Sequence, residues 1–396
     1  MAQTKKARTT TFANPFSGFK SLVAPDGQTA DFVELFFDLV FVYAITRITH
    51  LTAEHLDIEH VLKSVLIFWL IWWAWSQYTW TLNAADTKSP EIRLGTLIVT
   101  AVTFVMASAI DQAFDDGVMW FAIPYIAIKA LGMALYIRVT PSEDDENAAV
   151  ARMAGLTVPG LAAVFGGALA DPSQRVWWWL AAIILDMISG FIAGRFQGWR
   201  MRVEHFTERH GLIVIVALGE SLIVAASAIQ GEERSADLLI SGGLAVLVTC
   251  LLWWSYFAWI REHLEEQLTE KSGSERARLG RDVFSFMHFP LIFGIIGIAV
   301  GFEKIVSHPH DPLTLPIVAA LGGGVVLFVA FTAAAVWRSS RSLLIPRIGI
   351  LTLTSAALVL TIDKDPKYAL GLIAGGLFLI DAIEWKKCRR PLVADR

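Results

Sequence analysis

Residues 238–260 read LLISGGLAVLVTCLLWWSYFAWI, a run of 23 residues without one charged side chain. A helix needs about 20 apolar residues to cross the ~30 Å hydrocarbon core of a bilayer. An open sheet cannot satisfy its backbone groups in lipid, so a run of this length predicts a transmembrane helix rather than a strand. The stretch therefore predicts an all-α, polytopic integral membrane protein.

The composition of the whole chain agrees with that prediction. Of 396 residues, 55% are hydrophobic and only 18% are charged, which is too little charge to cover the surface of a soluble protein. The 15 tryptophans suit the headgroup zones of a membrane. The expected partner is the lipid bilayer, with no nucleic acid, and the sequence does not decide the oligomeric state.

Eleven further runs resemble the first in length and hydropathy. The weakest are the fifth, with Pro159 and four glycines, and the eleventh, which is short and follows Pro346; we expect both to be broken or tilted helices. The twelve predicted spans are 33–51, 61–82, 93–111, 118–138, 149–170, 175–194, 209–229, 237–260, 282–303, 313–337, 343–361 and 367–385. A short amphipathic helix is expected in the loop near 261–281.

Lysine and arginine alternate between the two sets of loops. With the N-terminus placed in the cytoplasm, the cytoplasmic segments hold 25 of the 33 basic residues and the opposite loops hold 5. Positive charge near spans marks the cytoplasmic side, so the pattern predicts that both termini are cytoplasmic.

Four pairs of segments suggest an internal repeat of six helices. ELFFDLVFV at 34–42 aligns with ERHGLIVIV at 208–216, and ILDMI at 184–188 aligns with LIDAI at 379–383. Tryptophan pairs in spans 2 and 8 and Arg-Leu-Gly before spans 3 and 9 fall in the same order. Six spans per half give both halves the same orientation, as in some transporters. The predicted division is a tail (1–32), two repeats (33–203 and 204–387) and a second tail (388–396).

Three segments carry a family resemblance. ELFFDLVFVYA at 34–44, RHGLIVIVALGESLIV at 209–224 and HFPLIFGIIG at 288–297 resemble the bacterial low-temperature-requirement protein A family. The resemblance covers roughly residues 30–390. It implies a multi-spanning protein of the bacterial plasma (inner) membrane, in a family without a settled biochemical activity.

A more distant similarity concerns the endosomal and lysosomal potassium/proton channel family. That family also has two six-helix repeats, with an Arg…Phe-Ser-Asp motif in each first helix. Phe37-Asp38 matches the last part of the motif, but Phe36-Phe37 stands where Phe-Ser is expected and Leu212 replaces the acid of the second half. These departures are why no selectivity-filter residues of that family are assigned to this chain.

Ionisable residues within spans are costly in lipid and mark candidate sites. Glu34 and Asp38 are spaced i,i+4 and share one face of the first span. In one interpretation Glu34 caps the first turn and Asp38 bonds a neighbouring helix. In the other, the two acids form a cation or proton site at the mouth of a pathway.

Glu220 lies midway along the seventh span, between Gly219 and Ser221. The repeat alignment places it opposite Thr46 and beside the position of Arg47. We hypothesise that Arg47 and Glu220 pair across the axis, either as part of an ion or substrate pathway that includes Ser221 or as a fixed lock between the two halves.

Asp186 and Asp381 occupy matching positions in spans 6 and 12, and Lys129 lies in the middle of span 4. A buried lysine is either neutral or paired with a carboxylate. Lys129 and Asp186 are therefore a candidate charge-compensating pair, and the three residues are candidate members of a proton relay.

His210 and His288 are candidate pH-sensing residues, with packing by hydrogen bonds as the alternative. Trp72 and Trp73 fall in mid-span, where aromatic walls either pack or line a cavity for an apolar or cationic solute. No metal or cofactor is expected, and phosphate-loop, zinc-protease and serine-hydrolase motifs are missing.

The sequence therefore favours a transporter or channel-like protein that moves a small ion or solute, with protons as a candidate coupling ion, and not an enzyme. The alternatives are a membrane-embedded enzyme acting on lipid or isoprenoid and a non-transporting stress-adaptation protein. A transporter predicts a polar cavity at the half–half boundary reaching Asp38 or Glu220. An enzyme predicts a lateral opening with converging acids around a metal, and a structural protein predicts fully paired intramembrane charges.

Overall fold

The computed structural model describes residues 22–25, 27–140, 145–230, 235–308 and 310–388, and over these residues the chain is all-α apart from one isolated bridge between Val23 and Ala85. The predicted tails lie largely outside the described residues. The helices of the first half are α1 (Phe32–Glu54), α2 (Ile58–Ala84), α3 (Pro90–Ser108), α4 (Met119–Val139), α5 (Asp145–Leu169) and α6 (Pro172–Ala193). Those of the second half are α7 (Val203–Gln230), α8 (Ala236–Phe257), α9 (Ile260–Thr269), α10 (Gly273–Gly280), α11 (His288–Ser307), α12 (Leu315–Ser340), α13 (Ile345–Leu358) and α14 (Pro366–Cys388).

Every predicted span coincides with a helix, which confirms the all-α membrane fold. Within the described part of the chain, ten helices are long and apolar enough to cross a membrane. The other two predicted spans are α1, which has 23 residues but carries several charges, and α13, which is shorter and ends in a 3₁₀ turn, η3 (Val359–Thr361).

The two weak spans differ from each other. Helix α5 runs unbroken for 25 residues through Pro159, so the fifth span is not broken, and the alternative of a tilted helix stays a prediction. Proline is tolerated in membrane helices because neighbouring groups satisfy the freed carbonyl. Helix α13 has only 14 residues before its 3₁₀ turn, in line with the expectation of an irregular eleventh span.

Local sequence explains where several helices begin. Asp57 precedes α2, and its Oδ1 accepts from the His60 backbone N–H at 3.0 Å. At the start of α8, the Ser235 hydroxyl accepts from the Leu238 backbone N–H at 3.1 Å. The hydrogen bond from His60 also lowers the pKa of the exposed Asp57 carboxyl. Proline at the first turn of α3, α6 and α14 has the φ angle that a helix start needs.

The loop after α8 folds as the amphipathic segment that the sequence predicts, but in two pieces, α9 and α10. Helix α10 then continues through a π-helical segment, η2 (Arg281–Phe286), into α11. Asp282 of this segment accepts from Arg281 (2.9 Å) and from Arg338 of α12 (2.6 Å), which fastens it to the neighbouring helix.

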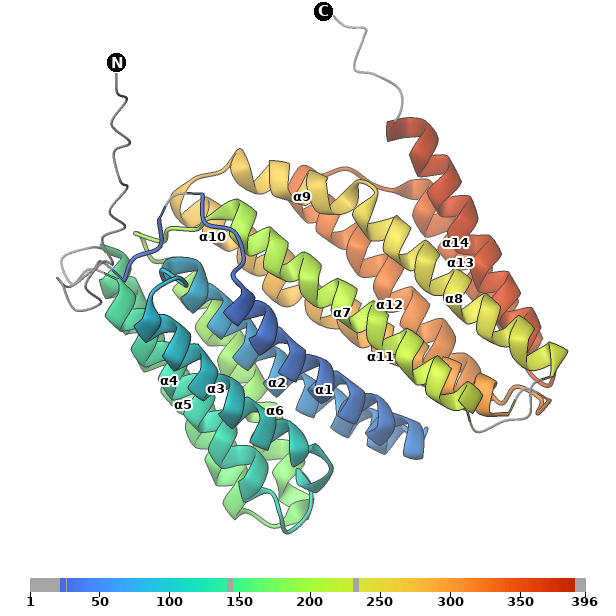
Figure 1. Ribbon diagram of the computed structural model, residues 1–396, viewed down its shortest axis with the longest axis horizontal. Helices are drawn as coiled ribbons and strands as arrows, with labels where there is room; N and C mark the ends of the chain where they lie inside the picture. The colour runs from blue at the N-terminus through green and yellow to red at the C-terminus, as the bar shows by residue number, and fades with distance from the viewer. Residues whose placement is uncertain (1–21, 26, 141–144, 231–234, 309, 389–396) are drawn as a thin grey trace, which may run out of the picture.

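The helices fall into two neighbouring groups (Figure 1). Helices α1–α6 lie together on one side of the view, and α7–α14 lie together on the other. Helices α1 and α2 of the first group contact α7 and α11 of the second, so these four helices lie at the boundary. The internal repeat itself stays a prediction.

Helices α11 and α12 form the tightest helix pair in the second group. A Cβ on Gly324 would lie 2.8 Å from the Ile298 backbone nitrogen, and one on Gly294 would lie 2.9 Å from that of Phe328. Such contacts leave no room for a methyl group. Glycine at both positions therefore lets the two backbones touch, as small residues do between membrane helices.

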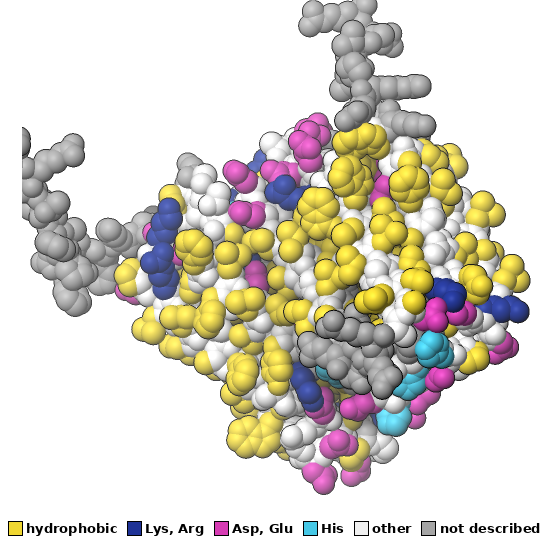
Figure 2. All heavy atoms as spheres, turned by 45° about the vertical axis from the view of Figure 1, so that its right-hand side comes forward, with side chains coloured by type: hydrophobic (Ala, Val, Ile, Leu, Met, Phe, Trp, Pro, Cys, Tyr) yellow, Lys and Arg dark blue, Asp and Glu magenta, His cyan; other side chains and the backbone are white. Residues whose placement is uncertain are grey.

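Hydrophobic side chains cover the outside of the helices. Figure 2 shows them spread over the middle of the molecule, with charged side chains gathered toward two opposite ends of this face. Many of these side chains are large and exposed, such as Leu239 at 62% and Phe378 at 61%. A soluble monomer rarely exposes so large an apolar area, whereas a lipid-facing surface requires it.

Candidate functional site

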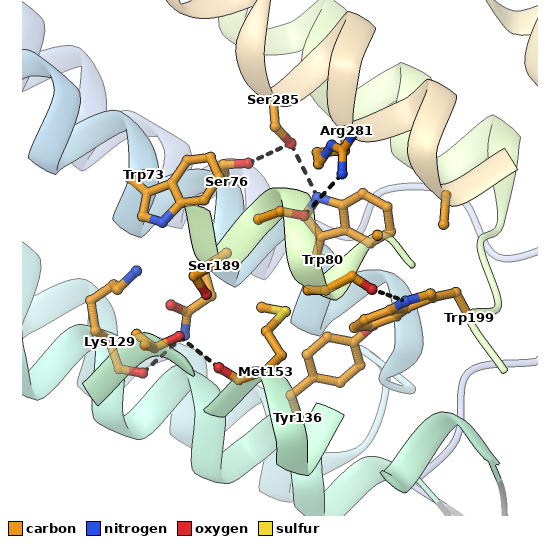
Figure 3. Close-up of a pocket in the computed structure, with 16 residues that line it drawn as sticks. Trp73, Ser76, Trp80, Lys129, Tyr136, Met153, Ser189, Trp199, Arg281 and Ser285 are labelled. Atoms are coloured by element: carbon orange, nitrogen blue, oxygen red, sulfur yellow. Dashed lines mark hydrogen bonds between the residues drawn. The ribbon is translucent and has the colours of Figure 1, made fainter. Parts of the chain in front are cut away.

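Lys129 of α4 and Asp186 of α6 form a buried ion pair, as the sequence predicts. Lys129 Nζ lies 3.7 Å from Asp186 Oδ1, and the two side chains are 1% and 3% exposed. The ammonium also lies 5.8 Å from the centre of the Trp73 ring, which Figure 3 shows on the facing side of the same cavity. A carboxylate and an aromatic face together stabilise a cation away from water.

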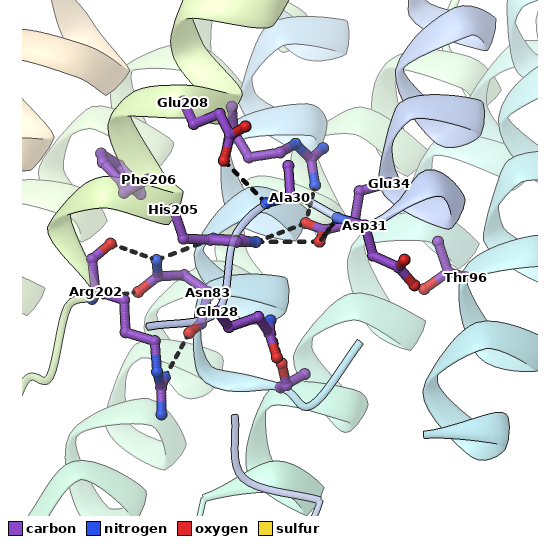
Figure 4. Close-up of polar contacts among 12 residues, drawn as sticks. Gln28, Ala30, Asp31, Glu34, Asn83, Thr96, Arg202, His205, Phe206 and Glu208 are labelled. Atoms are coloured by element: carbon purple, nitrogen blue, oxygen red, sulfur yellow. Dashed lines mark hydrogen bonds and ion pairs between the residues drawn. The ribbon is translucent and has the colours of Figure 1, made fainter. Parts of the chain in front are cut away.

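Glu34 begins a polar cluster at the start of α1 (Figure 4). Its Oε1 accepts from the Asp31 backbone N–H at 3.0 Å, so it closes a capping box at the first turn. Its Oε2 lies 3.0 Å from His205 Nε2 and also contacts the Arg209 guanidinium, both on α7. The capping interpretation is confirmed, and the same carboxylate links the two helix groups.

Asp38 lies one turn further along α1 and binds the same arginine. Arg209 Nε donates to Asp38 Oδ2 at 3.1 Å and NH2 donates to Oδ1 at 2.6 Å, while the Trp75 indole N–H donates to Oδ1 at 2.8 Å. Asp38 is 2% exposed, and Glu34 and Arg209 are fully buried. Asp38 therefore bonds neighbouring helices, as the first interpretation of this acid expects.

Arg47 pairs with Asp111 of the short 3₁₀ turn η1 (Ile110–Gln112), and not with Glu220. The hypothesis of a pair across the axis is thus wrong. Equal depth in the membrane does not fix the direction of a side chain. Successive residues of a helix point about 100° apart, so Thr46 faces the second group whereas Arg47 faces η1.

Glu220 lies at a cavity on the boundary between the two groups. The cavity has a volume of about 220 Å³ and is formed by α1, α7 and α11. Glu220 is 3% exposed, and Oε1 of Glu220 and Oε2 of Glu303 have no hydrogen-bond partner among the described residues. His50 Nδ1 lies 3.7 Å from Glu303 Oε2. The lining residues are Thr46, His50, Glu220, Ile223, Val224, Ser227, Glu303 and Ser307.

Ser221 faces away from that cavity. Its hydroxyl donates to the Leu218 carbonyl at 2.7 Å and lies 3.4 Å from Thr249 Oγ1 of α8. The structure therefore does not bring Ser221 together with Glu220.

Asp381 of α14 lies in a second buried group of charges. Neither of its carboxylate oxygens has a hydrogen-bond partner among the described residues. One turn away, Glu384 Oε1 accepts from Arg347 Nε of α13 at 2.9 Å, and Arg347 is 1% exposed. The same arginine donates to the hydroxyls of Ser255 and Thr332, both at 2.5 Å.

The two candidate histidines pack in an aromatic core. His288 Nε2 lies 2.7 Å from the Tyr256 hydroxyl and Nδ1 lies 2.9 Å from the Val283 carbonyl, so a neutral ring with the proton on Nδ1 satisfies both contacts. His210 Nδ1 lies 2.9 Å from the Phe206 carbonyl, and the two imidazole centroids are 5.6 Å apart. A pH-sensing role for either stays a prediction.

The sequence does not single out six titratable residues of these sites: His50, His205, Arg209, Glu303, Arg347 and Glu384. The topology prediction includes Arg209 and Arg347 among the cytoplasmic charges at the ends of spans, whereas α7 begins at Val203 and α13 at Ile345 and both side chains are buried. The signal that could have found them is an arginine within one or two turns of a helix start that also faces intramembrane acids.

Comparison with protein-family models identifies one family. The model of the family described as "Bacterial low temperature requirement A protein (LtrA)" matches residues 29–380. A protein of Rhizobium meliloti (strain 1021), named "Uncharacterized protein RA0937", is 27% identical over 376 residues, which are 90% of this chain and 89% of that protein. No solved structure matches this chain.

Proposed function

Since this chain belongs to the bacterial low temperature requirement A family and is a multi-pass membrane protein, we propose that it moves a small cation, the proton included, across the bacterial plasma membrane. In this proposal the cation reaches Glu220 through the cavity between α1, α7 and α11. The protein acts as a transporter or channel-like protein, not as an enzyme.

The observation that carries this proposal is the position of that cavity. A transporter predicts a polar cavity at the boundary of the two groups that reaches an intramembrane acid. The cavity between Thr46 and Glu220 meets this description, because Thr46 belongs to the first group and Glu220 to the second. Asp38, the other acid considered, is 2% exposed and both of its carboxylate oxygens accept from Arg209.

The chemistry of the lining favours a cation. Two carboxylates, Glu220 and Glu303, face one imidazole, His50, so the cavity carries net negative charge when the histidine is neutral. The hydroxyls of Thr46, Ser227 and Ser307 add further oxygen ligands. Hard cations prefer such oxygen groups, and a proton can bind directly to a carboxylate.

The orientation of the cavity follows from the predicted topology. With both termini in the cytoplasm, α1 begins at the cytoplasmic face, so His50 in its last turns lies toward the periplasm. The cavity then opens toward the periplasmic side and ends at Glu220 in the middle of α7.

A second candidate function is a static, non-transporting membrane scaffold. It is favoured by the extensive pairing of buried charges, in which Arg209 binds Glu34 and Asp38 and Arg347 binds Glu384. This candidate does not explain the unpartnered oxygens of Glu220 and Asp381.

Flux measurements in proteoliposomes separate the two candidates. Gradients of K⁺, Na⁺ and H⁺ are imposed one at a time on wild type, Glu220→Gln and the control Glu59→Gln, which neutralises an acid that is 73% exposed on α2. We expect cation-dependent flux in wild type and in the control. Liposomes with Glu220→Gln should show only the background flux rate of protein-free liposomes. If no cation or proton moves under any gradient, the transport proposal is wrong and the scaffold stands.

A further inference from the structure

The cavity beside Lys129 contains features that neither helix packing nor the proposed cation route explains. It lies between α2, α4, α5 and α6 of the first group, and the π-helical segment η2 of the second group closes it (Figure 3). From the groups that line it we infer that this cavity binds a small, uncharged, planar solute carrying both a carbonyl oxygen and an N–H, the chemistry of a primary amide or urea.

Two buried polar atoms of the lining have no partner. Gln77 is 5% exposed and Tyr136 is 1% exposed, yet Gln77 Oε1 and the Tyr136 hydroxyl make no hydrogen bond to any described residue. The Gln77 amide nitrogen donates to the Lys129 carbonyl at 2.9 Å, which fixes the orientation of the side chain and leaves Oε1 as an acceptor. Buried polar groups are almost always paired, so both atoms point to a ligand or water that completes them.

The lining atoms without hydrogen-bond partners define which donor and acceptor groups the ligand must carry. Gln77 Oε1 requires an N–H or O–H donor from the ligand. The Lys129 ammonium has three N–H donors and its nearest carboxylate oxygen is 3.7 Å away, so it can donate to a ligand oxygen. The Tyr136 hydroxyl can donate to a ligand acceptor or accept from a ligand donor. A ligand with a carbonyl and an N–H satisfies all three residues at once.

The charged groups of the lining are all paired, which favours an uncharged ligand. Lys129 is paired with Asp186, and Arg281 is paired with Asp282, whose Oδ1 accepts from it at 2.9 Å and whose Oδ2 accepts from Arg338. A free cation would be repelled by the two basic groups in the wall. A carboxylate such as acetate has no N–H for Gln77 Oε1.

The size and the walls fit a short planar molecule. The cavity volume of about 60 Å³ suits a small molecule. Trp73, Trp80, Tyr136 and Trp199 supply flat aromatic faces around it (Figure 3). Acetamide and urea each have four non-hydrogen atoms.

The segment η2 ties this cavity to the second helix group. The Ser285 hydroxyl, which lines the cavity, accepts from Ser76 at 2.8 Å and from the Trp80 indole N–H at 3.2 Å, both on α2. π-Helical turns occur often at functional sites, because the extra residue redirects side chains. Binding here does not depend on the cation route through Glu220, so failure of either proposal leaves the other standing.

Binding of ¹⁴C-acetamide to the full-length protein in nanodiscs tests the inference. We expect saturable binding that unlabelled acetamide and urea displace and that acetate, which has the same shape but a charge, does not. Tyr136→Phe removes only the hydroxyl and should weaken binding about threefold to tenfold, the effect of one neutral hydrogen bond. Tyr368→Phe, a matched change at a 59% exposed tyrosine, should bind like wild type.

Three results would overturn the inference: no saturable binding up to 100 mM acetamide, equal displacement by acetate, or unchanged affinity in a folded Tyr136→Phe. Folding is checked by the elution volume and the melting temperature of each variant. Should Tyr136→Phe not fold, Gln77→Met takes its place as the test variant. It keeps the length of the side chain but removes the amide, both the free acceptor and the donor to the Lys129 carbonyl, and it should show at least the same loss of affinity.

Discussion

The Arg209 guanidinium on α7 holds both carboxylate oxygens of Asp38 on α1, with Nε 3.1 Å from Oδ2 and NH2 2.6 Å from Oδ1. The first helix of one group is thereby fastened to the first helix of the other. Because the same guanidinium also contacts Glu34, one cation compensates two buried carboxylates, and His205 supplies a further contact to Glu34.

Removal of this arginine should destabilise the protein strongly. Arg209→Gln leaves two carboxylates buried without their charge partner, and loss of one member of a buried ion pair costs about 3–5 kcal/mol. The measurement is thermal unfolding of the detergent-solubilised protein. Arg93→Gln breaks an ion pair with Asp31 in which the arginine side chain is 48% exposed, and it should cost at most about 1 kcal/mol. Equal melting temperatures for the two variants would contradict this role of Arg209.

The sequence predicts the fold of this chain more fully than its sites. Hydropathy and the lengths of the apolar runs locate each of the twelve spans, since lipid leaves so few ways to satisfy a backbone. The pair of Lys129 and Asp186 also follows from sequence, because an isolated charge within a span needs a partner.

Side-chain direction is what the sequence cannot supply. The repeat alignment gives Arg47 and Glu220 a similar depth, and Thr46, the neighbour of Arg47, does line the cavity with Glu220. Yet Arg47 itself points to Asp111, since one step along a helix turns a side chain by about 100°. Arg209 was not predicted as a site residue because the predicted span starts at 209, whereas α7 begins at Val203 and buries this side chain. Arg347 lies within its predicted span, 343–361, and only the direction of its side chain shows that it pairs with Glu384.

The ion pair of Lys129 and Asp186 should appear as energetic coupling in a double-mutant cycle. Lys129→Met leaves a buried carboxylate unpaired, so adding Asp186→Asn should cost less than Asp186→Asn costs alone. For residues in contact we expect an interaction energy of about 0.5–3 kcal/mol from thermal or denaturant unfolding.

A matched pair of distant residues serves as the control for that cycle. Lys129→Met combined with Glu384→Gln, which lies on α14 of the other group, should be additive within about 0.5 kcal/mol. Additivity in the Lys129–Asp186 cycle as well would show that the two charges do not interact.

The close contact of α11 and α12 predicts different effects on stability when each of two adjacent glycines is replaced by alanine. Gly324→Ala places a methyl group against the α11 backbone at Ile298 and should destabilise the protein by about 1–3 kcal/mol, as overpacking does. Gly323→Ala meets no atom within 4 Å and should stay within about 0.5 kcal/mol of wild type. Unfolding of both variants under identical conditions measures the difference, and a Gly324→Ala protein as stable as wild type would refute the tight packing.

Access of water to the Glu220 cavity can be tested with cysteines one helix turn or more apart on α7. The chain has two native cysteines, so Cys250→Ala and Cys388→Ala give a cysteine-free background. Ser227→Cys lines the cavity and should react with a membrane-impermeant maleimide, whereas Ser221 is 1% exposed and faces Thr249 of α8, so Ser221→Cys should not react.

Under the predicted topology the reagent must be added from the periplasmic side. Reaction of Ser221→Cys at the same rate, or an inert Ser227→Cys, would mean that the cavity does not open to water. Reaction of Ser227→Cys only when the reagent is added from the cytoplasmic side would show that the orientation of the protein is opposite to the predicted one.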